Sequence, residues 1–94
     1  MGIDLVIKEL EAGNVRFARL VTVCTAFFGE PRRSASSHVV FKTPWQGNPR
    51  INLQKDGSQA KRYQIGQVVD ALRMLRSMPS GRPFGELKQQ EKKS

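Results

Sequence analysis

The strongest structural signal in this sequence is a pair of short runs typical of strands: an apolar run that follows His38, and a run after Arg50 in which apolar and polar side chains alternate. The runs cover residues 38–42 and 50–54, and residues 43–49 between them include two prolines and a glycine, which is typical of a loop. Alternate side chains of a strand point to opposite faces, so each run collects its larger apolar residues on one face. The sequence therefore predicts a β-hairpin whose inner face consists of Val39, Phe41, Ile51 and Leu53.

The outer face of this hairpin is polar and carries His38, the only histidine of the chain. An imidazole titrates near neutral pH and can exchange protons with an anion bound beside it and beside Lys42, which is expected on the same face. His38 is therefore the first candidate for a functional site. A lone histidine at the start of a strand more often has a surface or hydrogen-bonding role, so the residue type alone leaves both interpretations open. The other polar side chains on this face are Arg50, Asn52 and Gln54.

Two helices are expected before the hairpin. Apolar residues repeat at helical spacing from residue 3 to residue 11, and Gly13 ends this short N-terminal helix. Asn14 is expected to be the N-cap of a second helix, which Gly29 ends. Cys24 lies on its apolar stripe, and no histidine or second cysteine lies near it in the sequence, so it is interpreted as a small buried residue and not as a nucleophile. The stripe consists of Phe17, Leu20, Val21, Cys24 and Phe28.

The remaining elements complete an α+β fold. Residues 31–34 fit a short first strand, and apolar residues at helical spacing predict a last helix from about Tyr63 to Arg76. Beyond Met78, prolines, glycines and charges leave too little apolar content for a core. The expected domain thus spans residues 14–78, preceded by a helical extension at 1–13 and followed by a flexible basic tail at 79–94.

The charge distribution predicts an anionic partner. The 94-residue chain has a net charge of +8, and residues 31–62 contribute +6 of it, with Asp56 as their only acid. Basic residues that alternate with strands favour a folded nucleic-acid surface over a membrane-binding helix, although a merely solvated basic face is the alternative. Lys61 and Arg62 precede the last helix, where free backbone N–H groups also favour a phosphate. The bases are Arg32, Arg33, Lys42, Arg50, Lys55, Lys61 and Arg62.

The missing motifs exclude several kinds of enzyme. One histidine and one cysteine cannot form a Cys/His zinc site, no acidic cluster is spaced to hold magnesium, and neither a GxxxxGK[ST] loop nor a GxSxG elbow is present. No cofactor is therefore expected. RNA cleavage remains open because RNA supplies its own nucleophile, the 2′-OH, and needs only proton transfer and charge stabilisation. Trp45 is interpreted as a cover for the hairpin and not as a base-stacking residue.

The predicted location is the cytoplasm. The N-terminus lacks the basic and long apolar regions of a signal peptide, and a single cysteine cannot form an intramolecular disulfide. No apolar stretch approaches the roughly 20 residues that a membrane span needs, so a soluble protein is expected.

Several ordered motifs resemble the HicA family of toxin–antitoxin toxins, and the later ones are similar to an actinobacterial-type branch of that family. The resemblance runs continuously from Asn14 to about Leu75. The early motifs are Asn14-Val15-Arg16-Phe17, Phe27-Phe28-Gly29 and Ser37-His38-Val39-Val40-Phe41. The later ones are Asn52-Leu53-Gln54, Gly57, Ala60-Lys61 and Tyr63-Gln64-Ile65. Ser36 stands where the family usually has glycine, and Arg62 where it usually has proline.

The resemblance implies a double-stranded-RNA-binding-domain-like fold, in which a helix, three antiparallel strands and a helix follow one another. It also implies a metal-independent mRNA interferase that stops translation and that a HicB-like antitoxin protein neutralises. The family's catalytic histidine corresponds by position to His38.

These lines of evidence lead to one hypothesis with two alternatives. The hypothesis is an RNA-cleaving toxin in which His38 is the general acid or base and Ser37 positions the ring or the phosphate. The alternatives are a non-catalytic RNA-binding module of the same fold and a protein whose basic face docks an acidic protein partner. The expected RNA contacts are Lys42, Arg50, Lys61 and Arg62.

Overall fold

The computed structural model describes residues 1–33 and 38–78, and the regular elements within them form an α+β fold. Two helices come first, then three strands, then a long helix. The helices are α1 (Ile3–Glu11), α2 (Phe17–Phe28) and α3 (Arg62–Ser77). The strands are β1 (Arg32–Arg33), β2 (His38–Phe41) and β3 (Ile51–Gln54). This order is the one expected from the periodicity of the sequence, whereas the basic tail expected at 79–94 lies outside the described residues.

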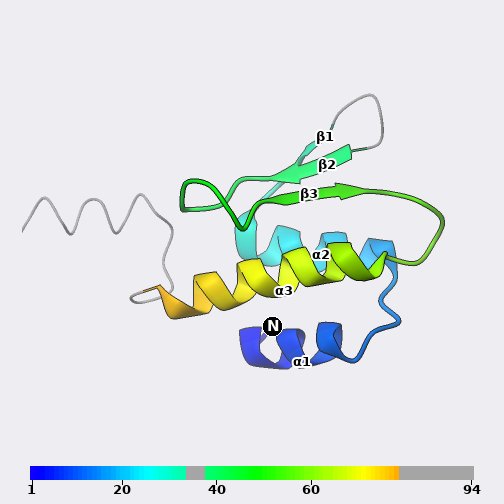
Figure 1. The fold of residues 1–94 in the computed structure, drawn as a ribbon, viewed down its shortest axis with the longest axis horizontal. Helices are drawn as coiled ribbons and strands as arrows, with labels where there is room; N and C mark the ends of the chain where they lie inside the picture. Colours follow the sequence, from blue (N-terminus) through cyan, green and yellow to red (C-terminus); the bar gives the residue numbers. More distant parts are fainter. Residues whose placement is uncertain (34–37, 79–94) are drawn as a thin grey trace, which may run out of the picture.

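The three strands form one antiparallel sheet in the order β1-β2-β3. Val39 pairs with Leu53 and Phe41 with Ile51, and all four side chains are buried, which confirms the predicted inner face of the hairpin. Helices α2 and α3 pack against this face, and α1 packs against α3 on the side away from the sheet (Figure 1). The described part of the molecule therefore has three layers: the sheet, then α2 with α3, then α1.

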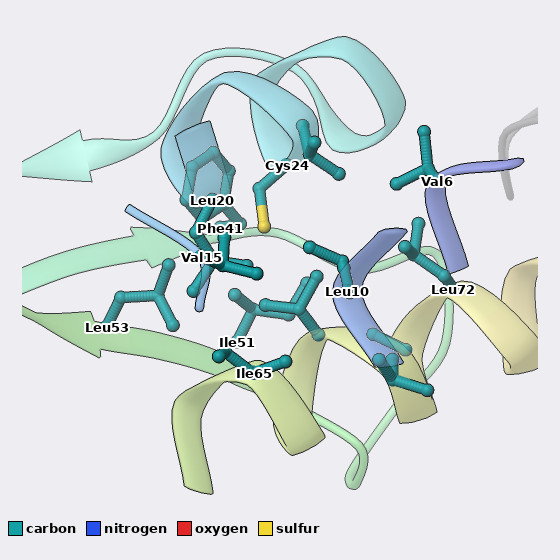
Figure 2. Close-up of a cluster of buried hydrophobic side chains, with 14 of the residues drawn as sticks. Val6, Leu10, Val15, Leu20, Cys24, Phe41, Ile51, Leu53, Ile65 and Leu72 are labelled. Carbon is teal, nitrogen blue, oxygen red and sulfur yellow. The ribbon is translucent and has the colours of Figure 1, made fainter. Parts of the chain in front are cut away.

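One hydrophobic cluster holds these layers together. Side chains from α1, α2, the sheet and α3 converge on it (Figure 2). Leu10 brings α1 into the cluster, which therefore extends beyond the helices that contact the sheet. Its members are Val6, Ile7, Leu10, Val15, Phe17, Leu20, Val23, Cys24, Val39, Phe41, Ile51, Leu53, Ile65, Val68, Val69, Ala71 and Leu72.

The predicted start of the second helix is wrong. Asn14 has φ 54° and is not the N-cap, because α2 begins only at Phe17 with Arg16 in the capping position. The N–H of Phe17 donates to the carbonyl of Ser58 at 2.9 Å, and the N–H of Ala60 donates to the carbonyl of Val15 at 2.8 Å. These long-range bonds hold the chain extended and delay the helix, while Asn14 takes a left-handed conformation that asparagine tolerates.

The ends of the other helices agree better with the sequence. Gly29, with φ 90°, follows α2 as expected, and α3 begins at Arg62 with Lys61 as its N-cap. On α2 the fully buried positions include Val23, which the predicted stripe omitted, while Val21 is only partly buried. Among the described residues, no helix has the length and apolar character needed to cross a bilayer.

Candidate nucleic-acid-binding face

The outward side of the sheet carries the predicted catalytic residue. Side chains alternate along β2 and β3, so the residues between the buried ones face away from α2 and α3. We call this surface the open face and define it by Arg32, His38, Val40, Asn52 and Gln54. His38 is partly buried, and Val40 is 40% exposed. A hairpin with an apolar inner face leaves these polar groups accessible to a ligand that lies along the sheet.

His38 lies at one end of the open face, between two polar neighbours. Gln54 pairs with it directly on β3, and residues paired in this way have Cβ atoms about 5 Å apart. Arg32 pairs with Val40 and is thus diagonal to His38, at about 7–8 Å. A guanidinium at this range can bind a phosphate while the imidazole exchanges protons with the oxygen groups beside that phosphate. Ser37, expected to position the ring, lies outside the described residues.

Lys42 and Arg50 lie at the other end of the same face. They follow and precede Phe41 and Ile51, the last pair of the ladder, and both are exposed. Lys42 lies four positions after His38, which at about 3.3 Å per residue is about 13 Å. Lys42 is therefore not a neighbour of His38, and Arg32 is the nearer cation.

Lys61 and Arg62 lie at the start of α3, at the His38 end of the sheet but on its helix side, opposite the open face. The chain turns back after β3 and enters α3 at that end (Figure 1), where the Nε2 of Gln64 donates to the carbonyl of Gln54 at 2.8 Å. Lys61 Nζ is 2.7 Å from Asp56 Oδ2 in an exposed ion pair. The hydrogen bond and charge of Asp56 raise the pKa of Lys61, and Lys61 lowers the pKa of Asp56.

The distribution of ion pairs concentrates positive charge near the sheet. Three acids of α1 bind arginines of α2 and α3, so these charges cancel where α1 meets the other two helices, on the side of the molecule away from the open face. Glu9 accepts two bonds from the guanidinium of Arg19, at 2.8 and 2.9 Å, and this hydrogen bonding lowers the pKa of Glu9. The pairs are Glu9 with Arg19, Glu11 with Arg73 and Asp4 with Arg76.

Two residues considered from the sequence have structural roles. Cys24 is fully buried, and burial raises the pKa of its thiol to about 12, so the nucleophilic thiolate does not form near neutral pH. Trp45 Nε1 donates to the carbonyl of Pro49 at 2.8 Å, and its ring meets that of Phe28 edge-on at 6.0 Å. Trp45 thus covers the end of the hairpin, as predicted from the sequence.

The described residues contain no group of three or more histidine, cysteine or acidic side chains that could hold a metal ion. Comparison with protein-family models, with curated proteins and with solved structures gives no match for this chain.

Two polar residues near the site were missed from the sequence. Arg32 was counted only as part of the basic stretch, because its place beside His38 depends on how β1 pairs with β2. Gln64 is 1% exposed and holds the end of β3. Its position four residues before Val68 falls on the apolar stripe of α3, which was a usable signal for burial.

Proposed function

We propose that this protein is a metal-independent endoribonuclease that cleaves mRNA, with His38 as its general acid or base. The observation that carries the proposal is the placement of the chain's only histidine on an open sheet face, with Arg32 diagonal to it. The excess of positive charge near the sheet supports an RNA substrate, because the acids of α1 form their ion pairs on the side of the molecule away from the open face.

The chemistry requires little from the protein besides proton transfer and positive charge. The 2′-OH of one nucleotide attacks the adjacent phosphorus, the bond to the 5′-oxygen of the next nucleotide breaks, and a 2′,3′-cyclic phosphate remains. His38 takes the proton from the attacking hydroxyl or gives one to the leaving 5′-oxygen. Arg32 stabilises the charge that develops on the phosphate, and Lys61 and Arg62 contact the RNA backbone where the strand passes the His38 end of the sheet toward α3.

Within this proposal the protein is a HicA-like toxin of a type II toxin–antitoxin system. The run α2-β1-β2-β3-α3, with both helices on one side of the sheet, supports a double-stranded-RNA-binding-domain-like fold for residues 14–78. A cytoplasmic HicB-like antitoxin protein would then be the partner. The motifs around His38 and from Asn52 to Ile65 are the ground for this assignment.

The test is cleavage of a messenger transcript by the purified protein in EDTA. We expect fragments that end in 2′,3′-cyclic phosphate, and we expect expression of the protein to inhibit growth. Salt-dependent RNA binding without cleavage would instead indicate the non-catalytic RNA-binding module. If the protein neither binds nor cleaves RNA, the proposal is refuted, and docking of an acidic protein partner remains as the explanation of the basic face.

A further inference from the structure

Two exposed cations lie just beyond the end of the open face that is farthest from His38. Lys42 and Arg50 are each one position beyond Phe41–Ile51, the last pair of the ladder, and flank the loop that joins β2 to β3. Both line one surface hollow of about 620 Å³, together with Thr43, Trp45, Gln46 and Gly47. The described residues that line this hollow include no acid.

The stability of the fold does not explain this arrangement. Lys42 and Arg50 line the same hollow, and like charges that lie close together repel each other. Within the described residues neither Lys42 nor Arg50 forms an ion pair, and Asp70, which lines a neighbouring hollow with Arg50, does not bind it. A bound anion between the two cations would remove the repulsion and gain charge-assisted hydrogen bonds.

The loop that joins the two cations is held in place by its own contacts. The indole N–H of Trp45 donates to the carbonyl of Pro49, and the backbone carbonyl of Trp45 accepts a hydrogen bond from Thr43 Oγ1 at 3.4 Å. The edge-on contact of Trp45 with Phe28 ties the loop to α2. Lys42 and Arg50 therefore flank a supported loop, so little ordering is needed when an anion binds.

We propose that Lys42 and Arg50 form a second phosphate-binding site, separate from the one at His38. This second site binds a phosphate of the same RNA strand at a distance from the bond that is cut. This inference rests on the proposed function. About 13 Å separates the two ends of the face, which is about four nucleotides of a stacked strand at about 3.4 Å each and fewer of an extended one. The substrate class is thus an RNA segment long enough to reach from His38 to the Lys42–Arg50 site.

The experiment compares substrates of different length with a single cleavable bond. DNA oligonucleotides carry one ribonucleotide, placed at the bond that the protein cuts most in a messenger transcript, and either one or six nucleotides on each side. For the parent protein we expect kcat/KM to be roughly tenfold higher for the long substrate, through a lower KM, because one more phosphate is bound. In the double variant Lys42→Gln/Arg50→Gln the ratio of long to short should fall severalfold, to the part that Lys61 and Arg62 contribute.

Neutral methylphosphonates, introduced one at a time into the long substrate, locate the bound phosphate. One position should weaken binding to the parent protein and have little effect on binding to the double variant, which is the signature of a direct contact. Lys8→Gln removes an exposed charge from α1, outside the open face, and should leave the length ratio unchanged. This control separates a local contact from the loss of net charge.

The outcomes distinguish this inference from the proposed function. If the parent protein cuts RNA and the double variant keeps the full advantage of the long substrate, the second site is refuted while the endoribonuclease proposal stands. If the parent protein cuts nothing, that proposal fails, and fluorescence anisotropy with the same oligonucleotides then tests the site by binding alone. Equal affinity and equal salt dependence for the parent protein and the double variant would overturn the site in that case.

Discussion

Gln64 Nε2 donates a hydrogen bond to the backbone carbonyl of Gln54 at 2.8 Å, and Gln54 is the residue that pairs with His38 across the sheet. Gln64 is 1% exposed, and its Oε1 has no hydrogen-bond partner among the described residues. A buried acceptor without a partner destabilises a fold, yet the donated bond fixes the end of β3 against the first turn of α3. One side chain thus connects the helix to the position opposite His38.

Replacing Gln64 with methionine should raise the stability of the fold. The change removes an unpaired acceptor, worth about 1–3 kcal/mol, and one hydrogen bond, worth about 0.5–1.5 kcal/mol. Gln54 is exposed on the edge strand β3, so water can bind the carbonyl that Gln64 no longer contacts. We therefore expect the free energy of unfolding in urea to increase by about 1 kcal/mol. A decrease of that size would mean that Oε1 has a partner, such as a buried water.

Helix α1 should contribute to stability through its buried side. Leu10 is 1% exposed and lies in the core cluster, so Leu10→Ala should lower the free energy of unfolding by about 2–5 kcal/mol. Leu5, on the same helix, is 73% exposed, and Leu5→Ala is the matched control with an expected change within about 0.5 kcal/mol. Equal effects of the two changes in urea unfolding would show that α1 is not docked as described.

The ion pair of Glu9 with Arg19 should make stability fall in acid. Because this hydrogen bonding lowers the pKa of Glu9 from its usual 4.5, the carboxylate stabilises the folded state above that value. The contribution is lost as the pH falls through the lowered pKa. It should be small, since both side chains are partly exposed. Urea midpoints measured between pH 7 and pH 3 should therefore fall less in Arg19→Gln than in the parent protein, and equal falls would contradict this.

Lys61 and Arg62 should contact RNA phosphates. Replacing both by alanine removes about two phosphate contacts and should flatten the slope of log affinity against log salt by about one to two units. Asp56→Asn removes the carboxylate that holds Lys61 at 2.7 Å and should tighten RNA binding. Fluorescence anisotropy at several salt concentrations measures both effects. An unchanged slope in the alanine variant would rule these contacts out.

The sequence predicted the elements whose buried face repeats along the chain. The inner face of the hairpin was predicted from the alternation around Leu53 and from Val39 and Phe41, which together are bulkier than the Val40 that faces the other way. The helical spacing of the apolar residues likewise placed α1 and α3. The start of α2 was not predictable in this way, because the extended backbone of Val15 bonds to a segment more than 40 residues later in the chain.

The sequence predicted on which side of the sheet His38 lies, but not how far each cation lies from it. The pattern predicted His38 and Lys42 on the same side of one strand, and in the structure Lys42 is exposed one position beyond the end of β2. Which cation lies nearest to His38 depends instead on the pairing of β1 with β2, which brings Arg32 close and leaves Lys42 about 13 Å away. Contacts between strands are set by tertiary packing, and a single sequence carries little information about them.

The most direct measurement of the central claim is the rate at which His38→Ala cleaves RNA in EDTA under single-turnover conditions. The ring is not part of the core cluster, so circular dichroism and RNA affinity should match those of the parent protein. The account predicts that the rate falls by roughly two or more powers of ten, as expected when a general acid or base is removed. A folded alanine variant that cleaves RNA as fast as the parent protein would contradict the assignment of His38 as the catalytic residue.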